Sequence, residues 1–527
     1  MAGWNEGYIV DIEYTHGFYR ELAPSVLSFA ALMQGVSAPG LRVEPLAYCE
    51  LGCGQGVSTN VLAAANPHVE FYATDFNPTH VAGAEALARA ARLPNVHFSD
   101  DSFAEFLERD DLPDFDIVAL HGIYSWISPA NRRTIVEFIR RKLKPGGLVY
   151  ASYNTMPGWA SVMPLRRLLV EYADRQASGS RAARIRAAVD FAERMSTLGT
   201  RFFAGHPKLA ERLKLLKTKD PHYIAHEYFN ADHNPFYFVD VAEEFADAKL
   251  RWIGSASPLE TIDELNLSAD QRKMLAEIDD IALRETLRDH IVDQGFRKDV
   301  FVKGPVRMSR SLARERWLDT RFALSRLPGD VPLEVHGRGY SMKLQPDFHR
   351  ALMAALDRTP RSLHEIMASP GLGETGLDRL IQSLVCLVGQ GSCHPGLDGQ
   401  AFAERKARTD AFNEAVAAQT VHEPTALTFA SPVTGSGIRV EQIDQMIWLG
   451  LRRREADIAD FVWRCMAETG HRLAREGKPL ATREEHLAEI RGRIAQFEEK
   501  TAPILGALGI DAGPPSHGEV RDLRRQA

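Results

Sequence analysis

The chain has 527 residues, 45% of them hydrophobic and 25% charged, which is typical of a globular protein with more than one core. Its formal net charge of −7 excludes a nucleic-acid footprint over the whole molecule. The five cysteines are odd in number and form no CxxC pair, so they support neither a disulfide framework nor a zinc site. We expect no signal peptide, no membrane span and a cytoplasmic location.

Short β-rich runs alternate with helical runs between residues 46 and 154. Helix boundaries are indicated by Pro67, by Pro129 and by the sequence Lys144-Pro145-Gly146-Gly147. This alternation predicts a mostly parallel sheet, and ligands of such sheets lie beyond the carboxyl ends of the strands. The expected strands are 46–51, 69–75, 95–98, 115–120 and 147–153.

Helical patterns dominate the rest of the chain. Residues 159–219 carry no strand signal, whereas 251–254 and 299–303 have the pattern of two strands that complete the first sheet. Helical segments between 348 and 389, with a hairpin-like stretch at 391–394, suggest a small winged-helix-like unit. A long helical tail is expected from about 440 to 500. The prediction is a seven-stranded α/β sheet with a helical insertion, followed by mainly α C-terminal domains.

The strongest motif is a glycine-rich turn between the first strand and the first helix. A dinucleotide-binding turn expects GxGxxG, but this sequence gives GxGxG with Val57 next. A tight GxG turn fits an aminoacyl group and a ribose better than a diphosphate, and glycine leaves the backbone bare toward a ligand. The alternative is an ordinary strand-to-helix turn. The residues assigned to ligand binding here are Glu50, Gly52, Cys53, Gly54 and Gly56.

Acidic residues end the second and third strands. Asp75, followed by Phe76, lies about twenty residues after the glycines, where a carboxylate accepts hydrogen bonds from ribose hydroxyls; its alternative role is a helix N-cap. Asp101, preferred slightly over Asp100, is placed to accept from an adenine amino group, with the backbone N–H of Ser102 beside it. Capping of the following helix is the alternative for either aspartate.

Polar and aromatic residues follow the fourth and fifth strands. They are expected at the mouth of the cleft, where they would contact the ligand and position the reacting groups, although Tyr124 and Trp126 are also plausible packing residues of a lid. His121, Tyr124 and Tyr153 are the candidates for accepting a proton, and the sequence does not choose between them. The residues assigned to this end are Leu120, His121, Tyr124, Trp126, Tyr153 and Asn154.

Together these motifs resemble those of the class I S-adenosylmethionine-dependent methyltransferases. The matching stretches are ELGCGQG, the acidic end of the second strand, FSDDS and LKPGGLVY. The resemblance implies a Rossmann-like fold and S-adenosylmethionine as the cofactor, with the glycine turn and His121 at its methionine part, Asp75 at the ribose and Asp101 at the adenine. Amide or nucleobase methylation loses support, because no Asn-Pro-Pro-Tyr follows the fourth strand.

A narrower resemblance is to methyltransferases that carry a methyltransferase regulatory domain, a group that includes rickettsial protein-lysine methyltransferases acting on an outer-membrane protein. It is carried by Tyr14 through Pro24, by HGIYSW and YNTMPGW, and by the aromatic stretch 226–238. The resemblance implies that Tyr14 closes over the cofactor and that the later domains serve substrate recognition or homodimerisation. The expected domains are 1–158 (cofactor-binding core), 159–235 (helical insertion), 236–305 (regulatory-type segment completing the sheet), 306–430 (winged-helix-like unit) and 431–527 (C-terminal helical region).

The expected function is therefore methyl transfer from S-adenosylmethionine to a protein lysine, which must be neutral to attack. A small-molecule acceptor and a cofactor-binding scaffold without turnover remain alternatives. A metal hydrolase is a further reading, from His222, His226, Glu227 and His233, but their spacing fits no common zinc site, so no metal is expected. A protein substrate is expected as the partner, and no nucleic acid.

Overall fold

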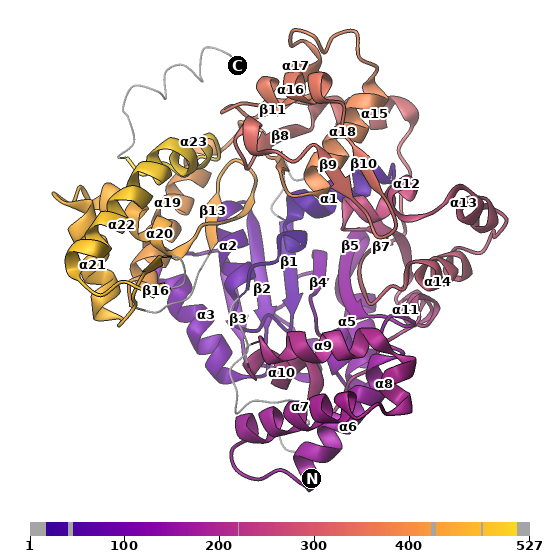
Figure 1. Cartoon of the computed structure of the whole chain (residues 1–527). Helices are drawn as coiled ribbons and strands as arrows, with labels where there is room; N and C mark the ends of the chain where they lie inside the picture. The colour runs from indigo at the N-terminus through magenta and orange to yellow at the C-terminus, as the bar shows by residue number, and fades with distance from the viewer. Residues whose placement is uncertain (1–16, 40–45, 220, 423–427, 476–477, 514–527) are drawn as a thin grey trace.

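The structure is a computed structural model that describes residues 17–39, 46–219, 221–422, 428–475 and 478–513. A seven-stranded sheet in the order β3-β2-β1-β4-β5-β7-β6 lies at its centre (Figure 1). The first five strands are parallel, and β7 runs antiparallel to both β5 and β6. This confirms the predicted Rossmann-like sheet. The strands are β1 (Leu46–Leu51), β2 (Val69–Thr74), β3 (Val96–Ser99), β4 (Phe115–Leu120), β5 (Leu143–Asn154), β6 (Leu250–Ser255) and β7 (Phe296–Lys303).

Capping residues fix where several helices of this layer begin. Asn77 accepts a hydrogen bond from the N–H of Thr79, and Ser128 accepts one from the N–H of Asn131. In both helices a proline follows the cap, where its fixed φ suits the first turn and its missing N–H costs no hydrogen bond. The helices are α1 (Pro24–Met33), α2 (Val57–Ala65), α3 (Pro78–Ala90), α4 (Phe103–Leu107), α5 (Pro129–Lys142), α11 (Phe238–Ala246), α12 (Asp263–Asn266), α13 (Ala269–Ala276) and α14 (Ile281–Val292).

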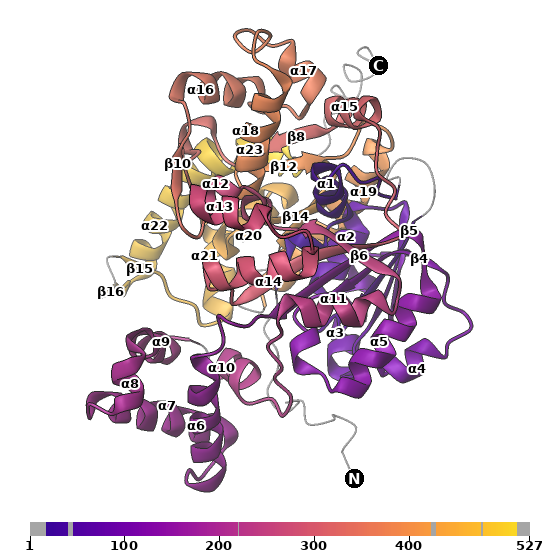
Figure 2. The same ribbon diagram turned by 90° about the vertical axis from the view of Figure 1, so that its right-hand side faces the viewer.

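The helical insertion between β5 and α11 forms a lobe with its own apolar core, built around Trp159, Leu165, Leu213 and Tyr228. It projects from the rest of the molecule in Figure 2. Its position follows from the parallel strands, because the chain enters it from the carboxyl end of β5. Its helices are α6 (Val162–Arg175), α7 (Arg181–Thr197), α8 (Arg201–Gly205), α9 (Pro207–Lys217) and α10 (Pro221–Tyr228).

Residues 304–401 combine helices with small antiparallel sheets. Strand β12 pairs with β8, and β8 also pairs with β11. The stretch 391–394, expected to be hairpin-like, is instead a turn that leads into β12, whose partner lies some seventy residues earlier in the chain. The winged-helix assignment stays a prediction. The elements are α15 (Arg310–Asp319), β8 (Arg321–Leu324), β9 (Glu334–His336), β10 (Ser341–Lys343), α16 (Pro346–Ala355), β11 (Arg361–Ser362), α17 (Leu363–Met367), α18 (Leu377–Gly389) and β12 (Cys393–Gly396).

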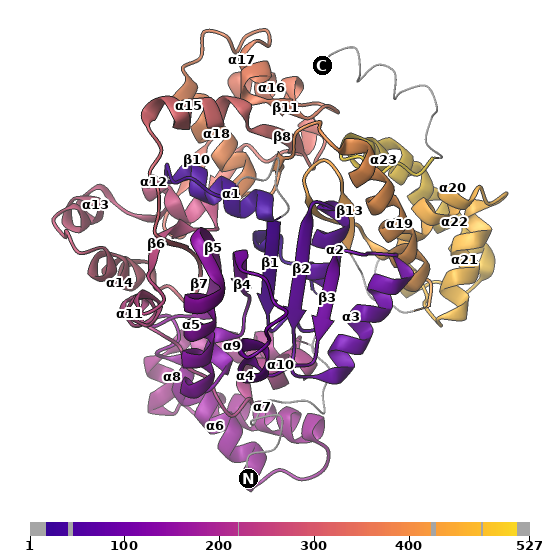
Figure 3. The same ribbon diagram turned by 180° about the vertical axis from the view of Figure 1, so that it is seen from behind.

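The C-terminal part is mainly helical and lies beside the central domain, at the edge formed by β3 and α3 (Figure 3). The expected long helix is divided, since Arg454 ends α20 in the left-handed conformation with φ 57°. No helix in the described ranges has both the length and the apolarity needed to cross a membrane. The elements are α19 (Phe402–Thr420), β13 (Thr428–Ser431), β14 (Ser436–Arg439), α20 (Gln442–Arg453), α21 (Ile458–Glu468), β15 (Ala474–Arg475), β16 (Lys478–Pro479), α22 (Arg483–Gln496) and α23 (Ala502–Ala507).

Helix α2 is the point where the central sheet meets the C-terminal part of the chain. All nine of its residues are buried, because β13, β14 and α19 pack on it in addition to the sheet. The side-chain amide of Asn66, which follows α2, donates to the carbonyl of Gly435 at 2.8 Å. A single apolar core therefore runs from the sheet into the C-terminal helices.

Candidate active site

A cavity opens at the carboxyl ends of the parallel strands. The glycine turn, the ends of β2 and β3, the β4–α5 loop and one residue of the segment after α10 contribute to its wall. Its place agrees with the general rule for open α/β sheets. The lining residues are Gly17, Tyr19, Glu50, Gly52, Cys53, Gly54, Gln55, Val57, Ser58, Asp75, Phe76, His80, Asp101, Ser102, Phe103, His121, Gly122, Ile123, Trp126, Ile127, Ser128, Asn131 and Asp232.

The glycine turn places bare backbone against this cavity. Gly54 has φ +53°, and a Cβ added there would meet no atom within 4 Å, so it would project into the cavity. Gly56 has φ +63° and serves packing, because a Cβ there would lie 2.4 Å from the Cβ of Ala84. Gly56 does not line the cavity. The turn thus forms a cradle that any side chain at Gly54 would fill.

Asp75 holds the turn in place. Its carboxylate accepts hydrogen bonds from the N–H of Gly54 at 2.8 Å and the N–H of Asn77 at 3.0 Å, and Nδ1 of His80 lies 3.2 Å away. A buried carboxylate with these partners remains an acceptor with capacity for ligand hydroxyls. The helix-capping alternative falls to Asn77 rather than to Asp75. Sequence reasoning missed His80, five residues after Asp75 and within the first turn of α3.

Glu50 contributes a second carboxylate at the base of the cavity. It is 3% exposed and accepts a hydrogen bond from the Thr59 hydroxyl at 2.5 Å. Burial raises the pKa of Glu50 to about 7, and the nearby Asp75 adds to this effect. A cationic ligand group would therefore favour the ionised form of Glu50.

Asp101, two residues after the end of β3, lies at the cavity wall. Its carboxylate pairs with the Arg109 guanidinium at 3.0 Å, and its backbone carbonyl accepts from the Thr74 hydroxyl. Ser102 caps α4 in a reciprocal arrangement with Glu105. Ser102 therefore caps the helix, while Asp101 lines the cavity. Asp100 does not line the cavity.

His121 lies between two tyrosines. Its ring stacks on Tyr19 with centroids 3.7 Å apart, and its Nδ1 is 3.0 Å from the Tyr150 hydroxyl. Burial lowers the pKa of His121 to about 3, so the ring is neutral at physiological pH. Leu120 is fully buried behind it and does not reach the cavity. Tyr14 lies outside the described residues; Tyr19, which the sequence interpretation missed, is the N-terminal aromatic residue found at the cavity.

Two of the three candidate proton acceptors are not in the cavity wall. Tyr124 is fully buried and its hydroxyl donates to Glu244, while the Tyr153 hydroxyl donates to Asp299 at 2.6 Å. Burial is the main reason why the pKa of each phenol is raised. Each phenol therefore keeps its proton at neutral pH and is not available to accept one from a substrate. Tyr153 faces away from the cavity because successive side chains of β5 point to opposite faces of the sheet.

Trp126, Asn154 and His233 are brought together beside the cavity, with Trp126 in its wall. The Asn154 side-chain nitrogen lies 3.0 Å from Nε2 of His233, so Asn154 acts through His233 rather than at the cavity itself. Asp232 precedes His233 and does line the cavity. Sequence reasoning missed Asp232, since nothing in the sequence indicates that the segment after α10 returns to the β4–α5 loop.

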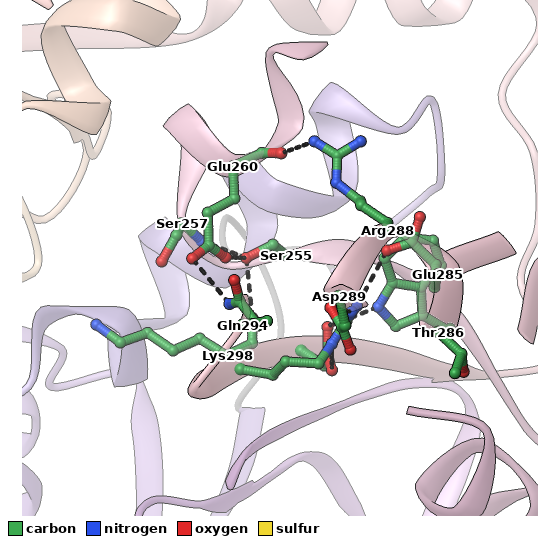
Figure 4. A network of polar contacts seen from close by, with 12 residues as sticks. Ser255, Ser257, Glu260, Glu285, Thr286, Arg288, Asp289, Gln294 and Lys298 are labelled. Atoms are coloured by element: carbon green, nitrogen blue, oxygen red, sulfur yellow. Dashed lines mark hydrogen bonds and ion pairs between the residues drawn. The ribbon is translucent and has the colours of Figure 1, made fainter. Parts of the chain in front are cut away.

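A polar network joins the outer strands to the helices beside them. Figure 4 shows Glu260 in contact with Gln294 and Arg288 next to it; the Arg288 guanidinium donates to the Glu260 carbonyl at 2.7 Å. Arg297 is surrounded by three carboxylates, those of Glu285, Asp289 and Asp299. Through Asp299 the network reaches Tyr153 on β5. It fixes the antiparallel edge of the sheet next to the strand that enters the insertion.

The donor set of the cavity suits an organic cofactor better than a metal ion. Within the described residues, no group of three His, Cys, Asp or Glu side chains is arranged to hold a metal ion. The cavity offers instead a glycine cradle, three carboxylates (Glu50, Asp75 and Asp101) and the rings of Tyr19, Phe76 and Phe103. Such a set matches a ligand with an amino acid part, a ribose and a flat base.

Known proteins with similar sequences and structures point the same way. Residues 49–149 match the family model "Methyltransferase domain", and residues 220–303 match "Predicted methyltransferase regulatory domain". An uncharacterized protein of Synechocystis sp. is 39% identical over 507 residues, covering 96% of this chain and 99% of that protein. An uncharacterized protein of Rickettsia prowazekii is 25% identical over 57% of this chain and 54% of its own length.

Among solved structures, PKMT2 from Rickettsia typhi in complex with AdoHcy superposes with a TM-score of 0.69 at 19% identity, over 94% of this chain and all of that one. This likeness shows a shared fold, which includes the helical regions beyond the sheet. The methyltransferase model coincides with the strands and turns that build the cavity. The chain belongs to the class I S-adenosylmethionine-dependent methyltransferases that carry a methyltransferase regulatory domain.

Proposed function

We propose that this enzyme transfers the methyl group of S-adenosylmethionine to the ε-amino group of a lysine in a protein substrate. The observation that carries the proposal is that Asp232 and Trp126 both line the cavity, and that Trp126 stacks on His233, the residue after Asp232. A carboxylate next to an indole face is the environment that favours an alkylammonium group. The resemblance to rickettsial protein-lysine methyltransferases supports the same acceptor.

The cofactor end is assigned to residues of this chain by their chemistry. Glu50 and the bare backbone of Gly52, Cys53 and Gly54 would hold the methionine part, with the Glu50 carboxylate meeting the amino group. Asp75 and Phe76 would hold the ribose, and Asp101 and the N–H of Ser102 the adenine. S-Adenosylmethionine supplies a methyl group bound to a positively charged sulfur. A neutral amine displaces this sulfur from the methyl carbon.

The protein residues act by positioning and by receiving a proton. Asp232 would first bind the ammonium form of lysine and then take its proton, directly or through water, which leaves a neutral amine. That neutral amine is the form whose nitrogen lone pair could attack the methyl carbon of the bound cofactor. Neutral His121, held by Tyr19 and Tyr150, would shape the site beside the cofactor without exchanging protons at neutral pH.

The test is methyl transfer from radiolabelled S-adenosylmethionine to a bacterial protein extract, followed by mass spectrometry of the labelled bands. The expected result is label on lysine residues, abolished by Asp75→Ala and strongly reduced by Asp232→Asn. Label that stays with metabolites after protein precipitation would replace lysine with a small-molecule acceptor. Cofactor binding without transfer to either fraction would mean a scaffold without turnover.

A further inference from the structure

The helical insertion is strongly basic within an acidic chain. Residues 162–219 contain 13 Lys and Arg residues against 5 Asp and Glu, while the whole chain has 63 against 70. Such a concentration of one charge in one lobe creates a local field that the net charge of the chain conceals. The lobe is therefore distinct in charge from the domain it extends.

Two neighbouring helices, α7 and α9, carry part of the exposed charge, and further exposed cations lie on α6 (Arg167 and Arg175) and on α8 (Arg201). Arg186 and Arg194 lie on α7 two turns apart, and Lys214 and Lys217 lie three residues apart on α9. Lys217 joins the two helices, because its Nζ is 3.3 Å from Asp190 and 2.6 Å from Glu193, both on α7. We call Arg186, Arg194, Lys214 and Lys217 the basic ridge. All four are exposed.

The ridge has charge available for a partner. Within the described part of the chain, Arg186, Arg194 and Lys214 form no ion pair, and Lys217 alone is committed to acidic neighbours. Large apolar side chains lie on the same two helices: Leu198, which follows α7, is 79% exposed and Leu215 on α9 is 61% exposed. An exposed mixture of cations and leucines is typical of a contact surface for another molecule.

The mixture favours a polypeptide over a nucleic acid or a membrane. Asp190 and Glu193 lie between the cations, and an acidic residue repels a continuous layer of phosphates. A folded or extended acidic segment can pair with separate cations and cover the leucines between them. The half-buried ring of Phe191 on α7 is already stacked on Tyr172 and lies against the Arg194 guanidinium, so it offers little face for stacking on bases.

The lobe also lies where a substrate must approach. It projects beyond the carboxyl ends of the parallel strands, on the side where the cavity opens (Figures 1 and 2). The segment that follows its last helix, α10, places Asp232 in the cavity wall. The segment that leaves the lobe therefore contributes directly to the cavity wall.

We propose that the basic ridge is a docking surface for an acidic segment of the protein substrate. This rests on the proposed protein methyltransferase function and names the chemistry of its substrate. Surface charges act through a field that salt screens over roughly 8 Å at physiological ionic strength. Docking on the ridge therefore raises the encounter rate and lowers KM for an acidic substrate, and leaves the chemical step unchanged.

The test compares two full-length triple variants of equal charge change. One is Arg186→Glu, Lys214→Glu and Arg194→Glu; the control is Arg453→Glu, Arg491→Glu and Lys500→Glu, three exposed cations of the C-terminal helices that form no ion pair within the described ranges. The probe is a fluorescent random copolymer of glutamate and lysine, rich in glutamate. Binding is measured by anisotropy without cofactor, at low and high salt.

The expected result is binding that weakens at least about tenfold in the ridge variant at low salt, changes little in the control, and loses this difference at high salt. Equal weakening in both variants, or none, overturns the ridge as a docking site. Stronger ridge-dependent binding to a DNA duplex, or to vesicles containing phosphatidylglycerol, overturns the choice of an acidic polypeptide.

Methyl transfer to the lysines of the copolymer separates this inference from the proposed function. Ridge-dependent binding without any transfer to lysine supports the docking surface and contradicts the lysine acceptor. Transfer that is equally efficient in wild type and ridge variant supports the lysine acceptor and overturns the docking surface. A ridge variant with a raised KM for the copolymer, an unchanged kcat and unchanged affinity for S-adenosylmethionine supports both.

Discussion

The indole ring of Trp126 stacks on the imidazole of His233, with ring centroids 4.2 Å apart and planes inclined by 10°. The stack joins the loop after β4 to the segment that leaves the insertion. His233 is held from two further sides, by the Asn154 amide at 3.0 Å and by the edge of Trp159 at 4.5 Å between centroids. Burial lowers the pKa of His233 to about 3, so the contact is between two neutral rings. The cavity wall at Trp126 is therefore supported by the segment that leaves the insertion.

Trp126→Ala is expected to raise KM for the protein acceptor about tenfold or more, because the cation loses an aromatic face and His233 loses its stacking partner. Affinity for S-adenosylmethionine, measured by calorimetry, should change less than twofold. Trp126→Phe keeps a ring and should recover most of the loss. Equal loss of cofactor and acceptor binding would instead indicate that Trp126 supports the whole cavity.

Asp75→Asn is expected to weaken binding of S-adenosylmethionine by roughly 10- to 100-fold, since hydrogen bonds to a charged acceptor contribute about 1.5–3 kcal/mol. The exchange also disturbs the hydrogen bond from Gly54 that shapes the turn. Calorimetric titration is the measurement, and Asp114→Asn at an exposed position is the matched control. Unchanged affinity in a folded variant would remove Asp75 from the ribose role.

Glu50 is expected to make cofactor affinity pH-dependent. Burial raises its pKa to about 7, so Glu50 is largely protonated at pH 6 and ionised at pH 8. Only the ionised form attracts the amino group of the cofactor, and affinity should therefore rise several-fold from pH 6 to pH 8. Glu50→Gln should bind more weakly at pH 8 and lose this dependence. A wild-type curve that is flat over this range would contradict the assignment.

Asp289 is expected to make the protein less stable as the pH rises. Burial raises its pKa to about 7, against the opposing effect of Arg297 and with a further increase from Asp299. Between pH 4 and 7 the folded state then holds a proton that the unfolded state has lost, so the free energy of unfolding falls with pH, by at most about 1.4 kcal/mol per pH unit. Asp289→Asn should reduce this slope in denaturant titrations. Identical slopes in the two proteins would show that Asp289 is ionised throughout.

Gly54→Ala and Gly56→Ala are expected to separate binding from folding. Both positions have positive φ, which costs an alanine on the order of 1 kcal/mol. At Gly54 the added methyl group enters the cavity, so cofactor affinity should fall with little further loss of stability. At Gly56 it collides with Ala84 at 2.4 Å, so the unfolding temperature should fall more than in Gly54→Ala. Similar effects of the two changes on binding and stability would contradict this division.

The central sheet was predictable because its strands are short and apolar, and because single residues mark the ends of the helices between them. Pro78 and Pro129 lie in the first turns of α3 and α5, and the glycine turn lies between β1 and α2. These signals are local. Asp75 and Asp101 could be assigned to one edge of the sheet for the same reason, because parallel strands bring their carboxyl ends together.

What the sequence did not indicate depends on contacts between distant segments. Asp232 reaches the cavity only because the insertion folds back on the β4–α5 loop. Tyr19 reaches His121 from the N-terminal segment. The Tyr153 phenol lies against Asp299 on β7, which is 146 residues later in the chain, rather than in the cavity wall. Local patterns carry no information on any of the three.

Helix α2 follows the glycine turn directly, and its outer surface is covered by α19, β13 and β14. The cofactor domain on its own would therefore have an uncovered apolar surface on α2. A fragment ending after β7 would present an apolar helix to water at the very element that positions the cradle, and would aggregate rather than work as a minimal enzyme. Catalytic competence is in this sense acquired late during synthesis, when α19, β13 and β14 leave the ribosome and pack on α2.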